Sequence, residues 1–365
     1  MPKSSKNIYI GTMSGTSADS IEAVAVCFKN NQVELLGLRS RRIKPQIQTI
    51  INQLASNQKI EMSLYGKINR MIASEFGECV NDLIKKMNIK SPEIRGIGFS
   101  GQTVWHHPLG KFPFSIQLGE PNFLAEKTQI PVVSNFRNSH IALGGEGAPL
   151  VTDFHSFLFR KKQPAIIINV GGISNFSFIS KQRVLGSDLG PGNALMDAYC
   201  QRFLKINFDR KGKLAASGKV DKRSINIMGR DKFFKLKHPK STGKELFNLS
   251  FIPKSLIKKS PEDILATLSY FTALTISIGI KDYQFGLKQA YICGGGAYND
   301  FLVKQIKELS GLDIHSTTHI GFDPKSIEAM AFAWLAKMRL EKKTLPVRSK
   351  KNVTSGLLGS ITQIR

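Results

Sequence analysis

Closely spaced cysteines and long apolar runs are both missing from this 365-residue sequence. The four cysteines stand far apart and form no CxxC pair: Cys27, Cys79, Cys200 and Cys293. A disulfide framework or a cysteine-ligated zinc site is therefore not expected, and the thiols should be buried and reduced in a cytoplasmic protein. The apolar runs, such as residues 165–170, are far shorter than the roughly 20 residues that cross a bilayer. Because the first residues also lack the apolar segment of a signal peptide, we expect no membrane association.

Acidic residues are scarce, with 27 Asp and Glu against 52 Lys and Arg and a net charge of +25 at pH 7. Such a charge attracts either nucleic acid or small anions. No RNA-binding signature, zinc finger or basic tail concentrates the charge. A diffuse, solvated lysine surface is therefore favoured, and nucleic acid is not expected as a partner.

Two common nucleotide-binding signatures are absent as well. The sequence has no GxxxxGK[ST] motif, which excludes a P-loop, and no GxGxxG motif after a strand. Residues 56–59 match the SxxK motif of penicillin-binding proteins, but the companion SDN and KTG motifs are missing. We interpret that match as chance.

The length and the order of patterns predict two α/β domains. A chain of 365 residues exceeds the size at which single cores usually divide. Residues 8–42 read as three short antiparallel strands, and apolar spacing over 62–87 predicts one face of a long helix. Residues 165–191 and 261–280 repeat this plan, again with glycine turns after the strands. Two such domains facing each other across a cleft would gather the glycine turns in one place.

The first glycine-rich bend carries small residues and hydroxyls between two apolar strands: Gly11, Ser14, Gly15, Thr16 and Ser17. Backbone N–H groups left open in such a bend form a nest that binds phosphate oxygens. Asp19 at its edge offers an oxygen ligand for Mg²⁺, directly or through water. A purely structural hairpin turn explains the same residues equally well.

A second cluster, GSDLGPGN, places Asp188 where a strand turns through Gly190 and Gly192 into a helix. The N–H groups at the start of that helix would favour phosphate. An acid in this position is suited to act as a general base or to bind a metal ion. The alternative is an aspartate that satisfies the amides of its own turn.

Two further glycine turns follow strands, at Gly171–Gly172 and at Gly294–Gly296. The triple glycine would let the backbone pack closely against a flat ring such as adenine. Each turn is weak evidence alone, because glycine turns after strands are frequent in α/β proteins.

Polar residues also gather at two other strand ends. Gln102 follows one strand, and Arg137 offers a clamp for a carboxylate or phosphate group. Surface solvation is the favoured interpretation for His106 and His107, and adjacent strand residues point to opposite faces, which makes joint metal binding improbable.

Ten ordered motifs resemble those of the anhydro-N-acetylmuramic acid kinases of bacterial cell-wall recycling. They are GTMSGTSADSIEAV, SGQTVWHHP, QLGEPNFLAEKTQIPVVSNFR, GGEGAPLVTDFH, NVGGISN, DLGPGNALMDAY, PKSTGKELFN, PEDILATLSYFTA, CGGGAYN and IEAMAFAWLA. The similarity runs from about Ile8 to the terminal VTSGLLGSI. It implies the fold of the sugar kinase/Hsp70/actin superfamily, with two RNase H-like α/β domains around a central cleft. We expect residues 1–135 and 335–365 in the first domain and residues 136–334 in the second.

The resemblance also implies a reaction that depends on ATP and Mg²⁺. Water opens the anhydro bridge of 1,6-anhydro-N-acetylmuramic acid while O6 takes the γ-phosphoryl group, which gives N-acetylmuramic acid 6-phosphate and ADP. The family's catalytic aspartate matches Asp188 as general base, and its active-site glutamate matches Glu328. Its sugar-binding arginine matches Arg137, to which we add Gln102 and Asn193 as candidate substrate residues. Its ATP segment matches Gly15, Thr16, Ser17, Ala18, Asp19, Ser20, Ile21 and Glu22, and the glycine turns at 171–172, 190, 192 and 294–296 complete the expected nucleotide site.

The chain departs from the usual family pattern at several positions: Ala18, Ser20, Glu22, Ser100, Asn135, Glu146 and Leu189. Three hypotheses therefore stay open: the family's own reaction, a kinase of the same fold acting on another amino sugar, and a catalytically weak ATP-binding protein or basic nucleic-acid binder. The expected partners are ATP and a small amino sugar, and the sequence leaves a homodimer open.

Overall fold

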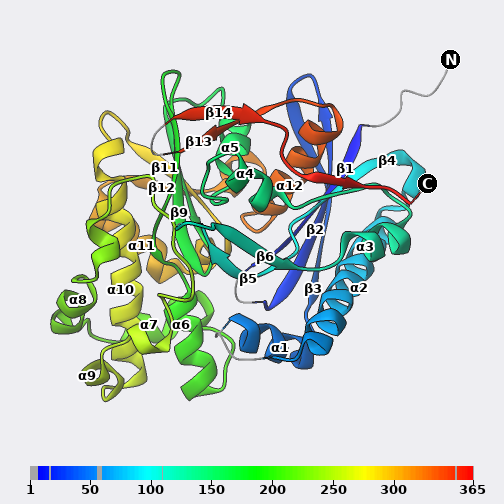
Figure 1. Ribbon diagram of the computed structural model, residues 1–365. Coiled ribbons are helices and arrows are strands. Elements are labelled where there is room, and N and C mark those ends of the chain that lie inside the picture. Colours follow the sequence, from blue (N-terminus) through cyan, green and yellow to red (C-terminus); the bar gives the residue numbers. More distant parts are fainter. Residues whose placement is uncertain (1–6, 16–17, 56–59, 109, 350–351, 365) are drawn as a thin grey trace. The chain divides into compact units, whose positions relative to one another are not determined.

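The computed structural model describes residues 7–15, 18–55, 60–108, 110–349 and 352–364. The chain forms two compact units (Figure 1). The first unit combines Met1–Leu158 with Lys325–Arg365, and the second is the continuous segment Phe159–Pro324. The second unit is therefore an insertion between two segments that fold together.

These boundaries differ from those expected from the sequence, which placed residues 136–158 and 325–334 in the second domain. Helices α4 (Phe136–Ala142) and α5 (Thr152–Leu158) pack on the first unit instead. The Asp153 carboxylate pairs with Arg348 at 2.7 Å, and the Phe154 ring lies 6.2 Å from that of Trp334. Because Trp334 belongs to helix α12 (Ser326–Leu340), the expected boundary cut through a helix of the first unit.

One six-stranded sheet forms the centre of the first unit, in the order β15-β7-β4-β1-β2-β3. Its strands are β1 (Ile8–Ser14), β2 (Ser20–Lys29), β3 (Gln32–Arg42), β4 (Ile94–Phe99), β7 (Val132–Ser134) and β15 (Ser360–Thr362). Strands β1 to β3 pair antiparallel, whereas β4 and β7 run parallel to β1. The carboxyl ends of β1, β4 and β7 consequently meet at one edge of the sheet. Two small hairpins complete the strands: β5 (Gln102–His107) with β6 (Phe114–Leu118), and β13 (Leu345–Arg348) with β14 (Val353–Gly356).

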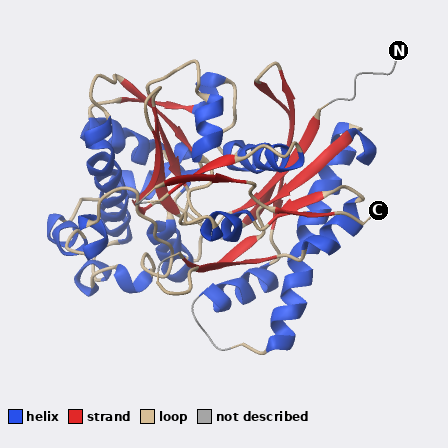
Figure 2. Ribbon diagram, turned by 45° about the horizontal axis from the view of Figure 1, so that its top comes forward, coloured by secondary structure: helices blue, strands red, loops and turns tan. Residues whose placement is uncertain are grey.

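Helix α2 (Met62–Met87) covers one face of this sheet (Figure 2). It confirms the helix that the apolar spacing of the sequence predicts over residues 62–87. Ile68, Ile72 and Phe76 are fully buried against Ile8 and Ile10 of β1. The remaining helices of the unit that are not yet named are α1 (Pro45–Ala55) and α3 (Pro121–Thr128).

Helix α12 lies on the opposite face, directly over two glycines on neighbouring strands. Gly11 of β1 and Gly98 of β4 are register partners. A Cβ at Gly11 would overlap the Ala329 carbonyl oxygen, and a Cβ at Gly98 would overlap that of Phe332. The helix backbone therefore touches the sheet backbone, which only glycine permits.

The second unit repeats the strand order of the first, with a five-stranded sheet β10-β9-β8-β11-β12. Its strands are β8 (Ala165–Val170), β9 (Ile173–Ile179), β10 (Val184–Pro191), β11 (Gln289–Cys293) and β12 (Asp313–Ser316). The first three are antiparallel neighbours, and β11 and β12 run parallel to β8. The repeated architecture expected from the sequence is thus present in both sheets, and the carboxyl ends of β8, β10 and β11 meet at one edge.

The central helix of the second unit is α10 (Pro261–Ile280), which begins as the sequence indicated. Ser260 accepts a hydrogen bond from the Asp263 N–H, and Pro261 occupies the first turn. Residues Pro261–Tyr283 are apolar and long enough to cross a membrane, contrary to the sequence expectation, but 72% of the apolar window is buried. The helix is therefore the core element of its unit. The other helices are α6 (Ala194–Tyr199), α7 (Lys213–Ser217), α8 (Lys222–Met228), α9 (Lys254–Ile257) and α11 (Asp300–Ser310).

Substituting Gly11 by Ala should destabilise the protein by about 3 kcal/mol, because the added methyl group must separate β1 from α12. Gly66 is the matched control, since it lies in the exposed face of α2 with no atom within 4 Å of its Cβ position. Gly66→Ala should stabilise by roughly 0.5–1 kcal/mol through helix propensity. Urea unfolding of both variants measures these changes, and equal midpoints would contradict the packing argument.

Candidate functional site

The Gln102 side chain forms hydrogen bonds with two residues of the bend after β1. The Ser14 hydroxyl donates to Gln102 Oε1 at 2.6 Å, and Gln102 Nε2 donates to the Gly15 carbonyl oxygen at 3.2 Å. Gln102 is fully buried, so it fixes the bend rather than lying open to a ligand. Ala18 has a positive φ of 53° and donates its N–H to Gly15 O. The expected phosphate-binding residues Thr16 and Ser17 lie outside the described residues.

Two carboxylates follow the bend. Asp19 Oδ1 accepts a hydrogen bond from Gln48 Nε2 at 2.8 Å, and Glu22 Oε1 accepts one from the Ser20 hydroxyl at 2.6 Å. No group of three or more His, Cys, Asp or Glu residues that could hold a metal ion occurs in the described part of the chain. One carboxylate with nearby hydroxyls nevertheless fits Mg²⁺, which keeps several waters and takes further ligands from phosphate.

Glu22 and the first turn of α12 share one face of the sheet. Glu22 is the register partner of Met13, which alternates with Gly11 on the face that α12 covers. Burial raises the pKa of Glu22, while hydrogen bonds from Ser20 and the positive charge of Lys325 act in the opposite direction. Glu328 lies in that first turn and is half-buried.

Arg137 supports a glycine loop. Its Nη1 donates to the Gly147 carbonyl oxygen at 2.8 Å, and Gly147 N donates to His140 Nδ1 at 3.0 Å. Burial and the Arg137 charge lower the pKa of His140 to about 4 and that of His106 to about 3. Both imidazoles are therefore neutral at pH 7, and His106 is half-buried, with its Nε2 atom shielded from solvent, rather than solvated as expected from the sequence.

A polar hollow of about 350 Å³ opens beside these residues, at the carboxyl ends of β4 and β7. Hydroxyl and amide groups dominate its wall, and Glu120 is the charged residue among them. Its lining residues are Tyr65, Asn69, Phe99, Ser100, Gly101, Ser115, Ile116, Gln117, Gly119, Glu120, Pro121, Ser134, Asn135 and Asn138. Ser100 and Asn135, two departures from the family pattern, thus line the same hollow, whereas Gln102 and Arg137 are not among these lining residues.

In the second unit, the turn at Gly171–Gly172 is joined to the end of β10. Gly192 N and Ala194 N donate to the Gly172 carbonyl oxygen, and Asn193 N donates to that of Gly171. These amides, which the sequence suggested as phosphate donors, are therefore already bonded within the protein. Gly192 is required because a Cβ there would overlap the Gly171 oxygen. Gly190, with a φ of 149°, follows a bulge in the strand.

The Asp188 carboxylate is oriented by a segment far away in the sequence. Thr242 N donates to Asp188 Oδ2 at 2.9 Å, and the Ser241 hydroxyl lies 3.4 Å from the same oxygen. Asp188 N in turn donates to Lys240 O at 2.9 Å, so residues 240–242 run along the edge of β10. The side chain is only 4% exposed. The segment belongs to the PKSTGKELFN motif, but the sequence indicates no role for it, because Thr242 lies 54 positions after Asp188.

Asn175 is a further residue that sequence analysis missed. It is the register partner of both Asp188 on β10 and Asn169 on β8, so the three side chains form one polar row across the sheet. The Asn175 Oδ1 atom is buried and has no hydrogen-bond partner in the described structure. An acceptor left unsatisfied beside a candidate base is suited to a donor on a ligand or water.

The triple glycine divides into two structural residues and one open residue. A Cβ at Gly294 would lie 2.5 Å from Asn169 Oδ1, and one at Gly296 would overlap Val170. Gly295 is exposed, and its Cβ position meets only Asn193 Nδ2, at 3.7 Å. Gly295 is therefore the open residue of the triple-glycine turn, next to the Asn193 side chain.

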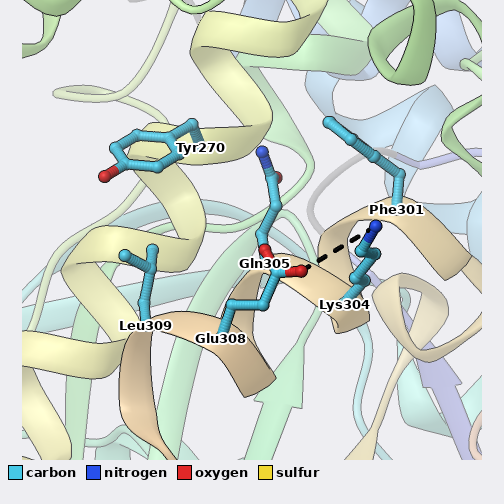
Figure 3. A pocket seen from close by; sticks show the side chains of 6 residues that line it. All are labelled: Tyr270, Phe301, Lys304, Gln305, Glu308 and Leu309. Carbon is cyan, nitrogen blue, oxygen red and sulfur yellow. Dashed lines mark ion pairs between the residues drawn. The ribbon is translucent and has the colours of Figure 1, made fainter.

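A second hollow, of about 270 Å³, lies between α10 and α11 (Figure 3). It is lined by Tyr270, Phe301, Lys304, Gln305, Glu308 and Leu309, and Lys304 pairs with Glu308 at 3.8 Å. None of the site residues expected from the sequence belongs to this wall, so we assign it no part in the chemistry.

Comparison with known proteins decides the family. The family model described as anhydro-N-acetylmuramic acid kinase matches residues 7–362. The chain belongs to the anhydro-N-acetylmuramic acid kinase family. A curated member from Gamma-proteobacterium EBAC31A08 is 44% identical over 361 residues, which cover 98% of this chain and 99% of the relative. Members from Vibrio vulnificus and Coxiella burnetii are 37% and 38% identical and cover 93% of the chain.

Membership in the anhydro-N-acetylmuramic acid kinase family confirms the resemblance drawn from ten motifs and makes the chain a phosphotransferase. The solved structure of component A of (R)-2-hydroxyglutaryl-CoA dehydratase from Acidaminococcus fermentans has the same fold, with a TM-score of 0.52 and 12% identity. It covers 92% of this chain and all of that one. The predicted α/β fold class is confirmed.

The structure gathers the site residues within each unit. In the first unit the bend residues, Gln102 and Glu328 adjoin the carboxyl end of β1, and Ile21 is a core residue beneath α2. In the second unit the three glycine turns and Asn193 share one edge with Asp188 on β10. Their roles in binding and catalysis remain predictions.

Glu22→Gln should become stabilising relative to the wild type as the pH rises from 4 to 8. Burial raises the pKa of Glu22 in the folded state, so the unfolded chain loses this proton at lower pH than the folded chain does. Ionised Glu22 therefore destabilises the fold at high pH, whereas Gln keeps the hydrogen bonds without the charge. Urea unfolding at both pH values tests the sign, and a stability difference independent of pH would contradict it.

Proposed function

We propose that the chain transfers the γ-phosphoryl group of ATP to O6 of 1,6-anhydro-N-acetylmuramic acid while water opens the anhydro ring. The oxygen of water bonds to the anomeric carbon as its bond to O6 breaks, and O6 takes the phosphoryl group. The products are N-acetylmuramic acid 6-phosphate and ADP. The match to the family model over residues 7–362 carries this proposal.

Asp188 is the general base in this scheme. A base must hold a fixed position within hydrogen-bond reach of the proton that it takes. The bonds from Thr242 N and Ser241 to Oδ2 supply that fixed position, and the neighbouring Asn175 Oδ1 offers an acceptor to the second hydrogen of the attacking water. These contacts support the role of Asp188 as general base.

Nucleotide binding is assigned to two sets of residues. Gly295 would receive the adenine ring, because it presents bare backbone, and the adjacent Asn193 stays a candidate substrate residue. The segment from Gly15 to Glu22 would receive phosphate oxygens, with Asp19 holding Mg²⁺ directly or through water. When bound, Mg²⁺ neutralises charge on the phosphate oxygens.

Sugar recognition is assigned to the polar hollow of the first unit and to Arg137. The amides of Asn69, Asn135 and Asn138 suit hydroxyl and N-acetyl groups. The guanidinium of Arg137 is always charged and can bind a carboxylate through two parallel hydrogen bonds, which suits a lactyl carboxylate. Because Ser100 and Asn135 both line the hollow, a same-fold kinase of another amino sugar is the second candidate.

We propose that the reaction takes place in the cytoplasm, where ATP is available. All four cysteines are thiols, and three of them are fully buried, which agrees with a reducing compartment. We assign no nucleic-acid partner, and the charge of +25 would act by attracting anionic substrates.

Asp188→Asn should lower turnover by at least about a thousandfold, since Asn cannot accept the proton of water. Coupled ADP release with Mg-ATP and anhydro-N-acetylmuramic acid measures the change. Folding should be preserved because the Asn carbonyl can still accept the Thr242 N–H bond. If the variant retained wild-type turnover, Asp188 would not be the base.

The same assay with a panel of amino sugars separates the two candidate substrates. ADP release with the anhydro sugar alone supports the proposal. Release only with another amino sugar would establish the second candidate, and no release with any sugar would leave a nucleotide-binding protein.

Gly295→Val should raise the KM for ATP about tenfold, because the side chain would occupy the space assigned to adenine. Its unfolding free energy should change by less than about 1 kcal/mol, since the Cβ position has no close neighbour. Gly296→Ala is the matched comparison and should instead destabilise by about 2 kcal/mol through overlap with Val170. An unchanged KM for ATP in Gly295→Val would contradict the assignment of adenine binding to this edge.

A further inference from the structure

Lys240 places a positive charge inside the second unit, where a charge needs partners. The residue is only 6% exposed. Its ammonium Nζ donates to the Phe233 carbonyl oxygen at 3.1 Å and lies 4.3 Å above the Phe233 ring. The Phe234 ring centroid lies 5.9 Å away. A carbonyl dipole and two aromatic faces replace part of the lost hydration, so the ammonium is held in one position.

The main chain of Lys240 is joined to the residues around the candidate base. Lys240 N donates to the Ser187 hydroxyl oxygen at 2.9 Å, and Lys240 O accepts the Asp188 N–H at 2.9 Å. Two residues later, Thr242 N reaches Asp188 Oδ2. The same short segment therefore carries a buried cation and fixes the carboxylate.

The electrostatic coupling between Lys240 and Asp188 acts in both directions. Burial lowers the pKa of Lys240, and the charge of Asp188 counteracts this effect. Coupling between two sites is reciprocal, so the ammonium favours the ionised carboxylate to the same extent. An ionised carboxylate is the form that can take a proton from water.

His238 is the titratable residue that lies two positions before Lys240 and also contacts Ser187. His238 contacts Ser187 through Nδ1 at 2.7 Å, and burial together with Lys240 lowers its pKa to about 4, against the opposing effects of the Gly279 backbone and Asp282. His238 is therefore neutral between pH 5.5 and 8 and adds no positive charge beside Asp188.

We propose that Lys240 is a positioning residue for the phosphoryl transfer: its buried ammonium keeps the Asp188 carboxylate ionised while its main chain sets the orientation of that carboxylate. The inference rests on the proposed function, in which Asp188 is the general base. It goes beyond that function because Lys240 acts on the base and not on the substrate.

The test compares Lys240→Met with the wild type in pH profiles of kcat and in KM values. Met preserves the length of the side chain and removes the charge. The acid limb of kcat should move up by about one pH unit, because Asp188 then holds its proton to higher pH. At pH values below the wild-type acid limb kcat should fall about tenfold, the loss should disappear well above that limb, and both KM values should stay within about twofold.

Two variants serve as controls. Lys237→Met removes an exposed charge three residues away and should leave the profile unchanged. Lys240→Arg keeps the positive charge and should retain the wild-type acid limb. A Lys240→Met enzyme with an unshifted acid limb, or a loss of kcat that is equal at every pH, would overturn the proposal.

A second measurement decides the matter without catalysis. Carbon-13 NMR titration of the Asp188 carboxyl group should show a higher midpoint in Lys240→Met than in the wild type, and an equal midpoint would overturn the proposal. This holds even if the wild type turns over no sugar, so failure of the proposed reaction and failure of the Lys240 role are distinguishable. If the Met variant does not fold, Lys240→Gln carries the same comparison, since its amide can still donate to Phe233 O.

Discussion

Backbone contact between helix α12 and the first sheet determines how the C-terminal segment of the chain joins its N-terminal strands. Gly11 and Gly98 are register partners on β1 and β4, and the carbonyl groups of Ala329 and Phe332 pack directly against them. Side chains at these two positions would push the helix outward. Because contact is this close, the first turn of α12, with Glu328, is set beside the bend that follows β1.

Both units have the same strand order, but different residues lie at the edge where the carboxyl ends of the parallel strands meet. In the first unit the edge carries the bend with Asp19 and Glu22 and a hollow of hydroxyl and amide groups. In the second unit it carries Asp188 and three glycine turns, in which the amides of Gly192 and Gly294 are bonded within the protein. The glycines there serve close packing first, and Gly295 is the exposed residue of the triple-glycine turn.

Features with a local cause could be predicted from the sequence. The spacing of apolar residues gave α2, and Ser260 with Pro261 gave the start of α10, because both depend on neighbouring residues. The contacts of Asp188 with residues 240–242 depend on tertiary pairing across more than fifty residues and had no sequence signal. The two compact units have other bounds than the sequence suggested for the same reason, since α5 is held by Arg348 and Trp334 from the far end of the chain.

The insertion of the second unit into the first has a consequence for the order of folding during synthesis. The second unit is one continuous segment and can be completed once Pro324 has left the ribosome. Until α12 has been synthesised, the face of the first sheet that carries Gly11 and Gly98 has no helix packed against it. A chain that ends shortly before Ser326 therefore contains the whole second unit but lacks the C-terminal segment of the first unit.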